Sequence, residues 1–212
     1  VDVFFVISGF LITTIIVREI EANEFSIIKF YERRIRRIYP ALYTTLLFIL
    51  IAAYFLYNPE NFTQASKSSM ATVGFVSNIL FWTESGYFNA PSTLKPLLHT
   101  WSLAVEEQFY IFFPLLVLMI MRYARKWLRA ILGALALLSF FINIYYIKQD
   151  ASAAFYFAHL RAWELLIGGL LSINIVPVNV KTPFRHLLSI IGLAMIIGSV
   201  LAYTQNTPFP GA

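Results

Sequence analysis

The chain has 212 residues, of which 59% are hydrophobic, 17% aromatic and only 13% charged. A soluble domain carries about 25% charged residues, so this composition excludes a soluble globular protein and, with a mean hydropathy of +0.71, predicts a polytopic membrane protein. The net charge of +5 is typical of basic loops that set membrane topology rather than of nucleic-acid binding, and the absence of cysteine excludes disulfides, thiolate nucleophiles and thiolate metal sites.

Residues 1–17 form the first predicted membrane span. Asp2 lies near its outer end, and the small pair Ser8 and Gly9 would let another backbone or a slim ligand approach closely. For Gly9 the alternative is a notch for helix packing. Because the chain starts inside an apolar run without a methionine or a basic region before it, we expect residues 1–212 to be a single membrane domain cut from a longer protein.

A charged segment follows at residues 18–39. Its second half mixes basic with apolar side chains, which predicts an amphipathic helix near residues 27–38 at the cytoplasmic surface. Arg33, Arg34 and Arg37 lie on this helix. Such arginines either set topology and bind anionic lipid, or hold the phosphates of a nucleotide-containing ligand with paired hydrogen bonds. The residues alone leave both interpretations open.

The apolar runs together predict an all-α bundle with about six full spans. Two basic clusters, at residues 18–37 and 122–129, should both be cytoplasmic by the positive-inside rule, so an even number of crossings separates them. The short segment 68–82 is therefore predicted to be re-entrant or interfacial on the outer side. The predicted spans are residues 1–17, 40–57, 100–121, 130–147, 154–173 and 186–203.

Residues 96–121 carry ionisable groups inside a membrane-length apolar run. A carboxylate there costs about 2.5–3.5 kcal/mol on insertion scales, so such groups are candidates for function. Glu107 points about 100° away from the other polar groups on a helix. The stripe predicts a proton-handling site, or alternatively Glu106 pairs with an arginine of a neighbouring helix and holds the bundle together. The residues that share the stripe at helical spacing are His99, Ser102, Glu106 and Tyr110.

A second pair of charges lies near the middle of a later predicted span. Arg161 and Glu164 are three residues apart and are expected to pair with each other, or Arg161 reaches Glu106 across the bundle. His159 and His186 have no metal-ligand spacing to a carboxylate or to each other, and His99 lacks a second histidine, so no metal site is predicted.

Four segments carry a family resemblance. The chain contains VDVFFVISGFLIT at 1–13, KFYERRIRRIYPAL at 29–42, LLHTWSLAVEEQFYIFFP at 97–114 and LRAWELLIGG at 160–169. In this order they resemble the acyltransferase-3 family of integral membrane acyltransferases. That family includes bacterial enzymes that O-acetylate the O-antigen of lipopolysaccharide and other envelope glycans. The resemblance therefore implies a multi-pass enzyme of the bacterial inner membrane.

The same resemblance implies substrates. An acyl group, with acetyl expected, would pass from cytoplasmic acyl-CoA to a hydroxyl of a glycan or lipid-linked sugar on the outer side, without a metal. In the family's motifs Arg34 and Arg37 meet the CoA phosphates, with Arg33 beside them, and Ser8 and Gly9 line a central channel. The family's key histidine would precede residue 1, which implies that this chain is an incomplete catalytic domain and not active by itself.

We expect direct acyl transfer, because neither a cysteine nor a G-x-S-x-G elbow offers a covalent route. The upstream histidine would be the base for the acceptor hydroxyl, with Glu106 or Asp2 orienting it or balancing its charge. The expected catalytic residues in this chain are thus Glu106, Asp2, His99 and Ser102, and the expected substrate-binding residues are Trp101, Arg161 and Glu164.

Two other functions stay open. A transporter or flippase for acyl groups or lipid-linked sugars would also place polar groups at mid-depth and contain a broken segment. A purely structural membrane partner would tolerate loss of both Arg34 and Arg37. Acyl-CoA hydrolysis or acyl transfer by the full-length protein would separate an enzyme from both.

Overall fold

The computed structural model describes residues 1–85, 95–173 and 182–202, and every element within these ranges is a helix. The all-α prediction is therefore confirmed for the described part of the chain. In chain order the elements are α1 (Asp2–Glu21), α2 (Ile27–Leu56), α3 (Pro59–Val73), α4 (Ser77–Thr83), α5 (Thr100–Tyr123), the short 3-10 helix η2 (Arg125–Trp127), α6 (Leu128–Gln149), α7 (Ala151–Tyr156), α8 (Ala158–Ser172) and α9 (Thr182–Ala202).

Four of the described helical segments are long and apolar enough to cross a membrane: α1, α2, α5 and η2 with α6. The other two expected spans correspond to α8, which has 15 residues, and to α9, whose apolar part covers residues 186–199. Length and apolarity thus support a multi-pass membrane bundle. The assignment of its two faces to the cytoplasm and the outside stays a prediction.

In contrast to the expectation of two elements that meet at Pro40, α2 is one continuous helix of 30 residues. Proline removes a helical hydrogen bond and usually breaks a helix in water. Membrane helices tolerate proline where water or local adjustments satisfy the carbonyl that it frees, which here belongs to Arg36, an exposed residue one turn before Pro40. The arginines of residues 33–37 therefore lie on a direct extension of a membrane span.

Residues 68–82 do not form a single helix. α3 ends at Val73 and α4 begins at Ser77, and Phe75 between them has a positive φ of 52°. Neither α3 nor α4 is among the described helices that could cross a membrane. The break agrees with the expectation that this segment is not a crossing, while its re-entrant or interfacial position stays a prediction.

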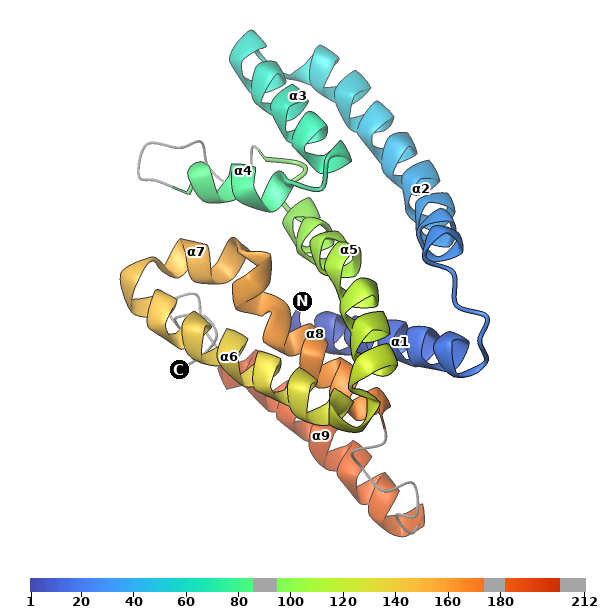
Figure 1. Cartoon of the computed structure of the whole chain (residues 1–212). Helices are drawn as coiled ribbons and strands as arrows, with labels where there is room; N and C mark the ends of the chain where they lie inside the picture. Colours follow the sequence, from blue (N-terminus) through green and yellow to red (C-terminus); the bar gives the residue numbers. More distant parts are fainter. Residues whose placement is uncertain (86–94, 174–181, 203–212) are drawn as a thin grey trace.

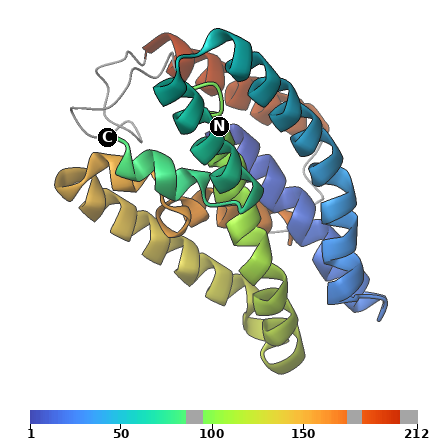
Figure 2. The same cartoon turned by 90° about the horizontal axis from the view of Figure 1, so that it is seen from above.

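The bundle is built around the pair α1 and α8, which contact each other along much of their length. α6 packs on α8, and α5 crosses both α1 and α8 (Figure 1). α2 and α3 form an antiparallel pair at one edge, and the view from above also places α2 at the periphery (Figure 2). Because α2 packs closely on α3 and only sparsely on α1 and α5, space remains between α1, α2 and α5.

Asp150 joins the short helices at one end of the bundle. Its carboxylate accepts hydrogen bonds from the Ala153 backbone N–H at 2.9 Å and from the Trp82 indole N–H at 3.0 Å. These bonds favour the charged form and hold the pKa of Asp150 below its usual value. As a cap it fixes the start of α7. The extended backbone at Phe157 ends α7, so the predicted span 154–173 is divided between α7 and α8.

Glycine sets the distance between α1 and α8. A Cβ atom on Gly9 would overlap the Leu165 carbonyl oxygen of α8, and a Cβ atom on Gly168 would overlap the Val6 carbonyl oxygen of α1. The two backbones are therefore in direct contact, as small residues allow in membrane helix pairs. This geometry favours the packing-notch interpretation of Gly9.

Replacing Gly9 with alanine is expected to lower the stability of the full-length protein by about 2–3 kcal/mol, because the added methyl group meets backbone that cannot turn away. Thermal unfolding in a constant detergent measures the change. Gly133→Ala is the matched control, since nothing lies within 4 Å of its Cβ position on α6 and alanine there should be neutral or stabilising. An unchanged melting temperature for Gly9→Ala would contradict the close contact.

Candidate active site

Three side chains from α1 and α5 form a buried polar network. The Glu106 carboxylate, in a side chain that is 6% exposed, accepts hydrogen bonds from the Ser8 hydroxyl and from the Tyr110 hydroxyl, the latter at 2.5 Å. The Ser8 and Tyr110 hydroxyls also contact each other. Among the described residues no arginine forms an ion pair with Glu106. Hydroxyl groups rather than a guanidinium therefore hold this carboxylate.

The neighbouring carboxylate has the arginine partner. Arg34 Nη2 on α2 donates to Glu107 Oε1 on α5 at 2.5 Å, and the two side chains are 17% and 10% exposed. The Arg34 guanidinium also lies 3.9 Å from the centre of the Tyr110 ring, a cation–π arrangement. An ion pair between α5 and an arginine of a neighbouring helix is thus present, but it involves Glu107 rather than Glu106. Sequence reasoning missed it, although two adjacent acids on one apolar helix indicate that each needs its own partner.

Two cavities meet at Glu106. We call the first the arginine cavity: it has a volume of about 250 Å³, and its polar lining consists of Ser8, Arg34, Arg37, Glu106, Glu107 and Tyr110. We call the second the histidine cavity: it has a volume of about 370 Å³, and its polar lining includes Thr45, His99, Thr100, Ser102 and Glu106. Phe4, Ile38, Leu103 and Glu106 belong to both linings, and Glu106 is the polar residue among them.

Three of the four residues of the stripe predicted on α5 share one cavity wall, while Tyr110 lines the arginine cavity. His99, Ser102 and Glu106 all line the histidine cavity. The Ser102 hydroxyl donates to the His99 carbonyl at 3.1 Å, and His99 is the exposed residue that precedes α5. Helical periodicity was enough to predict this grouping, because it depends on one helix alone.

Arg33 and Gly9 lie elsewhere. Arg33 pairs with Glu19 of α1 at 2.8 Å and is half exposed, and it lines neither cavity. Gly9 faces α8 while its neighbour Ser8 faces the arginine cavity. Of the residues expected to meet the donor, the structure brings Ser8, Arg34 and Arg37 together.

A separate charge cluster joins α1 to α8. Arg161, which is fully buried, pairs with Glu164 at 2.9 Å and with Asp2 at 2.5 Å. Its guanidinium lies 5.4–5.7 Å from the rings of Phe5, Trp101 and Phe155. The expected Arg161–Glu164 pair is present, and Asp2 rather than Glu106 is the second partner. Trp101, Arg161 and Glu164 line neither the arginine nor the histidine cavity, so their role in substrate binding stays a prediction.

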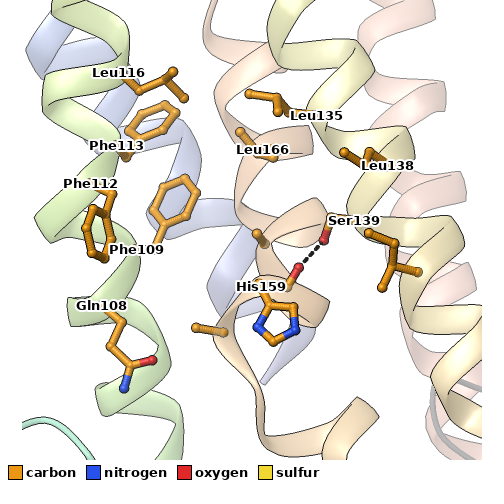
Figure 3. Close-up of a pocket in the computed structure, with 13 residues that line it drawn as sticks. Gln108, Phe109, Phe112, Phe113, Leu116, Leu135, Leu138, Ser139, His159 and Leu166 are labelled. Atoms are coloured by element: carbon orange, nitrogen blue, oxygen red, sulfur yellow. Dashed lines mark hydrogen bonds between the residues drawn. The ribbon is translucent and has the colours of Figure 1, made fainter. Parts of the chain in front are cut away.

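The largest cavity described is apolar and distinct from this site. It has a volume of about 550 Å³ and lies between α5, α6 and α8. Figure 3 shows Phe109, Phe113 and Leu116 on one side and Leu135, Leu138 and Leu166 on the other, with Gln108 and His159 towards one end. None of the predicted site residues lines it. The predicted site residues that line a cavity are those where α1, α2 and α5 face each other.

The arrangement supports acid–base and anion chemistry. A carboxylate with two hydroxyl partners can take up or orient a proton, and two arginines beside it can bind a phosphate. Within the described ranges no group of three or more His, Asp or Glu side chains could hold a metal ion.

Comparisons with known proteins give a consistent result. A family model described as an acyltransferase domain matches residues 1–210. A protein of Haemophilus influenzae described only as uncharacterized is 36% identical over 99% of this chain and 90% of its own length. The peptidoglycan O-acetyltransferase OatA of Listeria monocytogenes is 32% identical over 99% of this chain, and the O-acetyltransferase OatA of Staphylococcus aureus is 33% identical over 81%. The chain spans 34% and 29% of the length of these two enzymes. No solved structure matches.

Proposed function

Because the chain belongs to the acyltransferase-3 family, we propose that it carries the donor and transfer site of a membrane O-acyltransferase. The proposed reaction moves an acetyl group from cytoplasmic acetyl-CoA to a hydroxyl of an envelope glycan. The observation that carries the proposal is the position of Glu106, on the wall shared by the arginine cavity and the histidine cavity. Donor and acceptor can then approach one carboxylate, each through its own cavity.

The donor side rests on Arg34 and Arg37. They are one helical turn apart on α2 and line the same cavity. Arg37 is exposed, and within the described residues no carboxylate pairs with it. Guanidinium groups bind phosphate oxygens with two hydrogen bonds each. The nucleotide phosphates would lie at these arginines, and the thioester arm would extend past Ser8 towards Glu106.

The acceptor side rests on the histidine cavity. In acyl transfer the acceptor hydroxyl attacks the thioester carbonyl, its proton passes to a base, and the thiolate of CoA leaves. Glu106 would orient the base or balance its positive charge. The hydroxyls of Ser8 and Tyr110 would keep the Glu106 carboxylate in position. His99 and Ser102 would contact the glycan. No step in this scheme needs a covalent acyl-enzyme.

The acceptor is an envelope glycan rather than one named sugar. One relative is named for peptidoglycan, whereas the sequence motifs also occur in enzymes that modify O-antigen. Parallel assays with peptidoglycan fragments and with lipid-linked O-antigen units, using radiolabelled acetyl-CoA, would identify the acceptor. A transporter or flippase would move substrate without forming an ester, so the absence of any acetyl-CoA hydrolysis or transfer by the full-length protein would overturn the proposal.

Arg37→Ala in the full-length protein is expected to raise the KM for acetyl-CoA about tenfold or more, because a charge-assisted hydrogen bond to phosphate is lost. Little stability should be lost, since Arg37 is exposed and holds no carboxylate among the described residues. Arg36→Ala is the matched control: Arg36 is also exposed, pairs with Glu32 on the surface and lines neither cavity. Equal KM values for the two variants would remove Arg37 from the donor site.

A further inference from the structure

We propose that Glu107 is a built-in competitor of the acyl donor: it holds Arg34 in the resting protein and is displaced when a donor phosphate binds. This inference rests on the proposed function and adds to it the residue that sets donor affinity. Glu107 would act through Arg34, as a positioning residue, and not on the reacting atoms.

The ion pair between Arg34 and Glu107 is incomplete. Only Nη2 of Arg34 donates to Glu107, and the neighbouring Nε is buried without a hydrogen-bond partner among the described residues. A carboxylate or phosphate that approached the guanidinium side-on would accept from both nitrogens. A phosphate in this position would therefore make a hydrogen bond that Glu107 leaves unmade. This extra bond favours replacement of Glu107 by the phosphate at Arg34.

The displaced carboxylate has a place to go. Arg34 and Glu107 line the arginine cavity and also a third cavity, of about 260 Å³, with Tyr31 and Tyr39. The Tyr31 hydroxyl already donates to the Ile111 carbonyl at 2.7 Å. The Tyr39 hydroxyl makes no hydrogen bond to any residue in the described ranges, so it is available to donate to Glu107 after exchange.

The other buried arginine pair provides a contrast. Arg161 is fully buried, is surrounded by aromatic rings and borders neither the arginine nor the histidine cavity. The Arg34 side chain keeps 17% exposure and borders two cavities, and one turn away lies Arg37, which no carboxylate of the described residues pairs with. None of the described cavities borders Arg161, whereas two of them border the Arg34 pair.

Competition between Glu107 and the donor phosphate for Arg34 predicts the direction in which the KM for acetyl-CoA changes when Glu107 is replaced. If the pair is closed in about nine of ten resting molecules, the apparent affinity for the donor is reduced about tenfold. Glu107→Gln keeps the shape of the side chain but removes the competing charge. The KM for acetyl-CoA is therefore expected to fall about five- to tenfold, with a much smaller change in kcat. The rise in melting temperature caused by acetyl-CoA should also be larger than in the wild type, because the variant starts without a counter-ion.

The experiment compares the wild type with Glu107→Gln, Tyr39→Phe and Glu19→Gln, each in the full-length protein. Tyr39→Phe should raise the donor KM, because the displaced carboxylate loses its hydrogen-bond donor, and this variant keeps the ion pair and so remains informative if Glu107→Gln fails to fold. Glu19→Gln is the control, since it frees Arg33, which lines neither cavity, and should leave KM unchanged.

An unchanged or higher donor KM in Glu107→Gln, or an unchanged KM in Tyr39→Phe when Glu107→Gln does not fold, would overturn the inference. A merely structural Glu107 would lower the melting temperature while the acetyl-CoA-induced rise stayed equal to that of the wild type. Failure of the proposed function has a different signature, because the wild type itself would then show no acetyl transfer from acetyl-CoA.

Discussion

Replacing Glu106 with glutamine in the full-length protein is expected to lower acetyl transfer about a hundredfold or more. Glutamine keeps a side-chain oxygen that accepts from the Ser8 and Tyr110 hydroxyls, so the local packing should persist. It loses the negative charge and the ability to take up a proton, and acid–base groups of this kind contribute about 10²–10⁴-fold to rate. The measurement is kcat for transfer from acetyl-CoA to the glycan acceptor.

The controls for this variant separate charge from packing. Ser8→Ala removes one of the two hydroxyl partners and leaves the charge, so a smaller loss of kcat is expected. Glu60→Gln, on the exposed first turn of α3, should have no effect. Undiminished transfer by Glu106→Gln would remove Glu106 from the mechanism, and an equal loss in Ser8→Ala would assign the effect to geometry rather than charge.

Replacing Arg161 with methionine is expected to destabilise the protein by about 3–5 kcal/mol. Arg161 is fully buried and Glu164 is 1% exposed, so the change leaves a buried carboxylate without its partner. Asp2 is 57% exposed and is less affected, because water solvates it. Denaturant or thermal unfolding in a constant detergent measures the loss.

The double variant Arg161→Met with Glu164→Leu tests the cause. Replacing a buried ion pair with apolar side chains of similar volume is often neutral or stabilising, so the double variant should recover most of the lost stability. If it is as unstable as Arg161→Met alone, packing against Phe5, Trp101 and Phe155 matters more than the charges. Retained stability in Arg161→Met would contradict a structural role and favour the expected role in substrate binding.

The sequence by itself determined that the protein is a helical membrane protein, and it determined which polar residues share a face of the same helix. Apolar runs of membrane length identify helices because insertion depends on local hydropathy. The spacing of His99, Ser102 and Glu106 identified one face of α5, since that face depends only on the helical period. The family motifs located Arg34 and Arg37 on one segment. Each of these features belongs to a single helix.

The tertiary structure decided which groups meet. Glu106 and Glu107 are adjacent in sequence, yet one is held by hydroxyls of α1 and α5 and the other by Arg34 of α2. A helix fixes the direction of each side chain relative to its own axis, but the partner depends on the rotation and spacing of the neighbouring helices. Those are set by distant contacts such as Gly9 and Gly168, which bring α1 and α8 into direct backbone contact. For this reason the pairing of charges could not be predicted from periodicity alone.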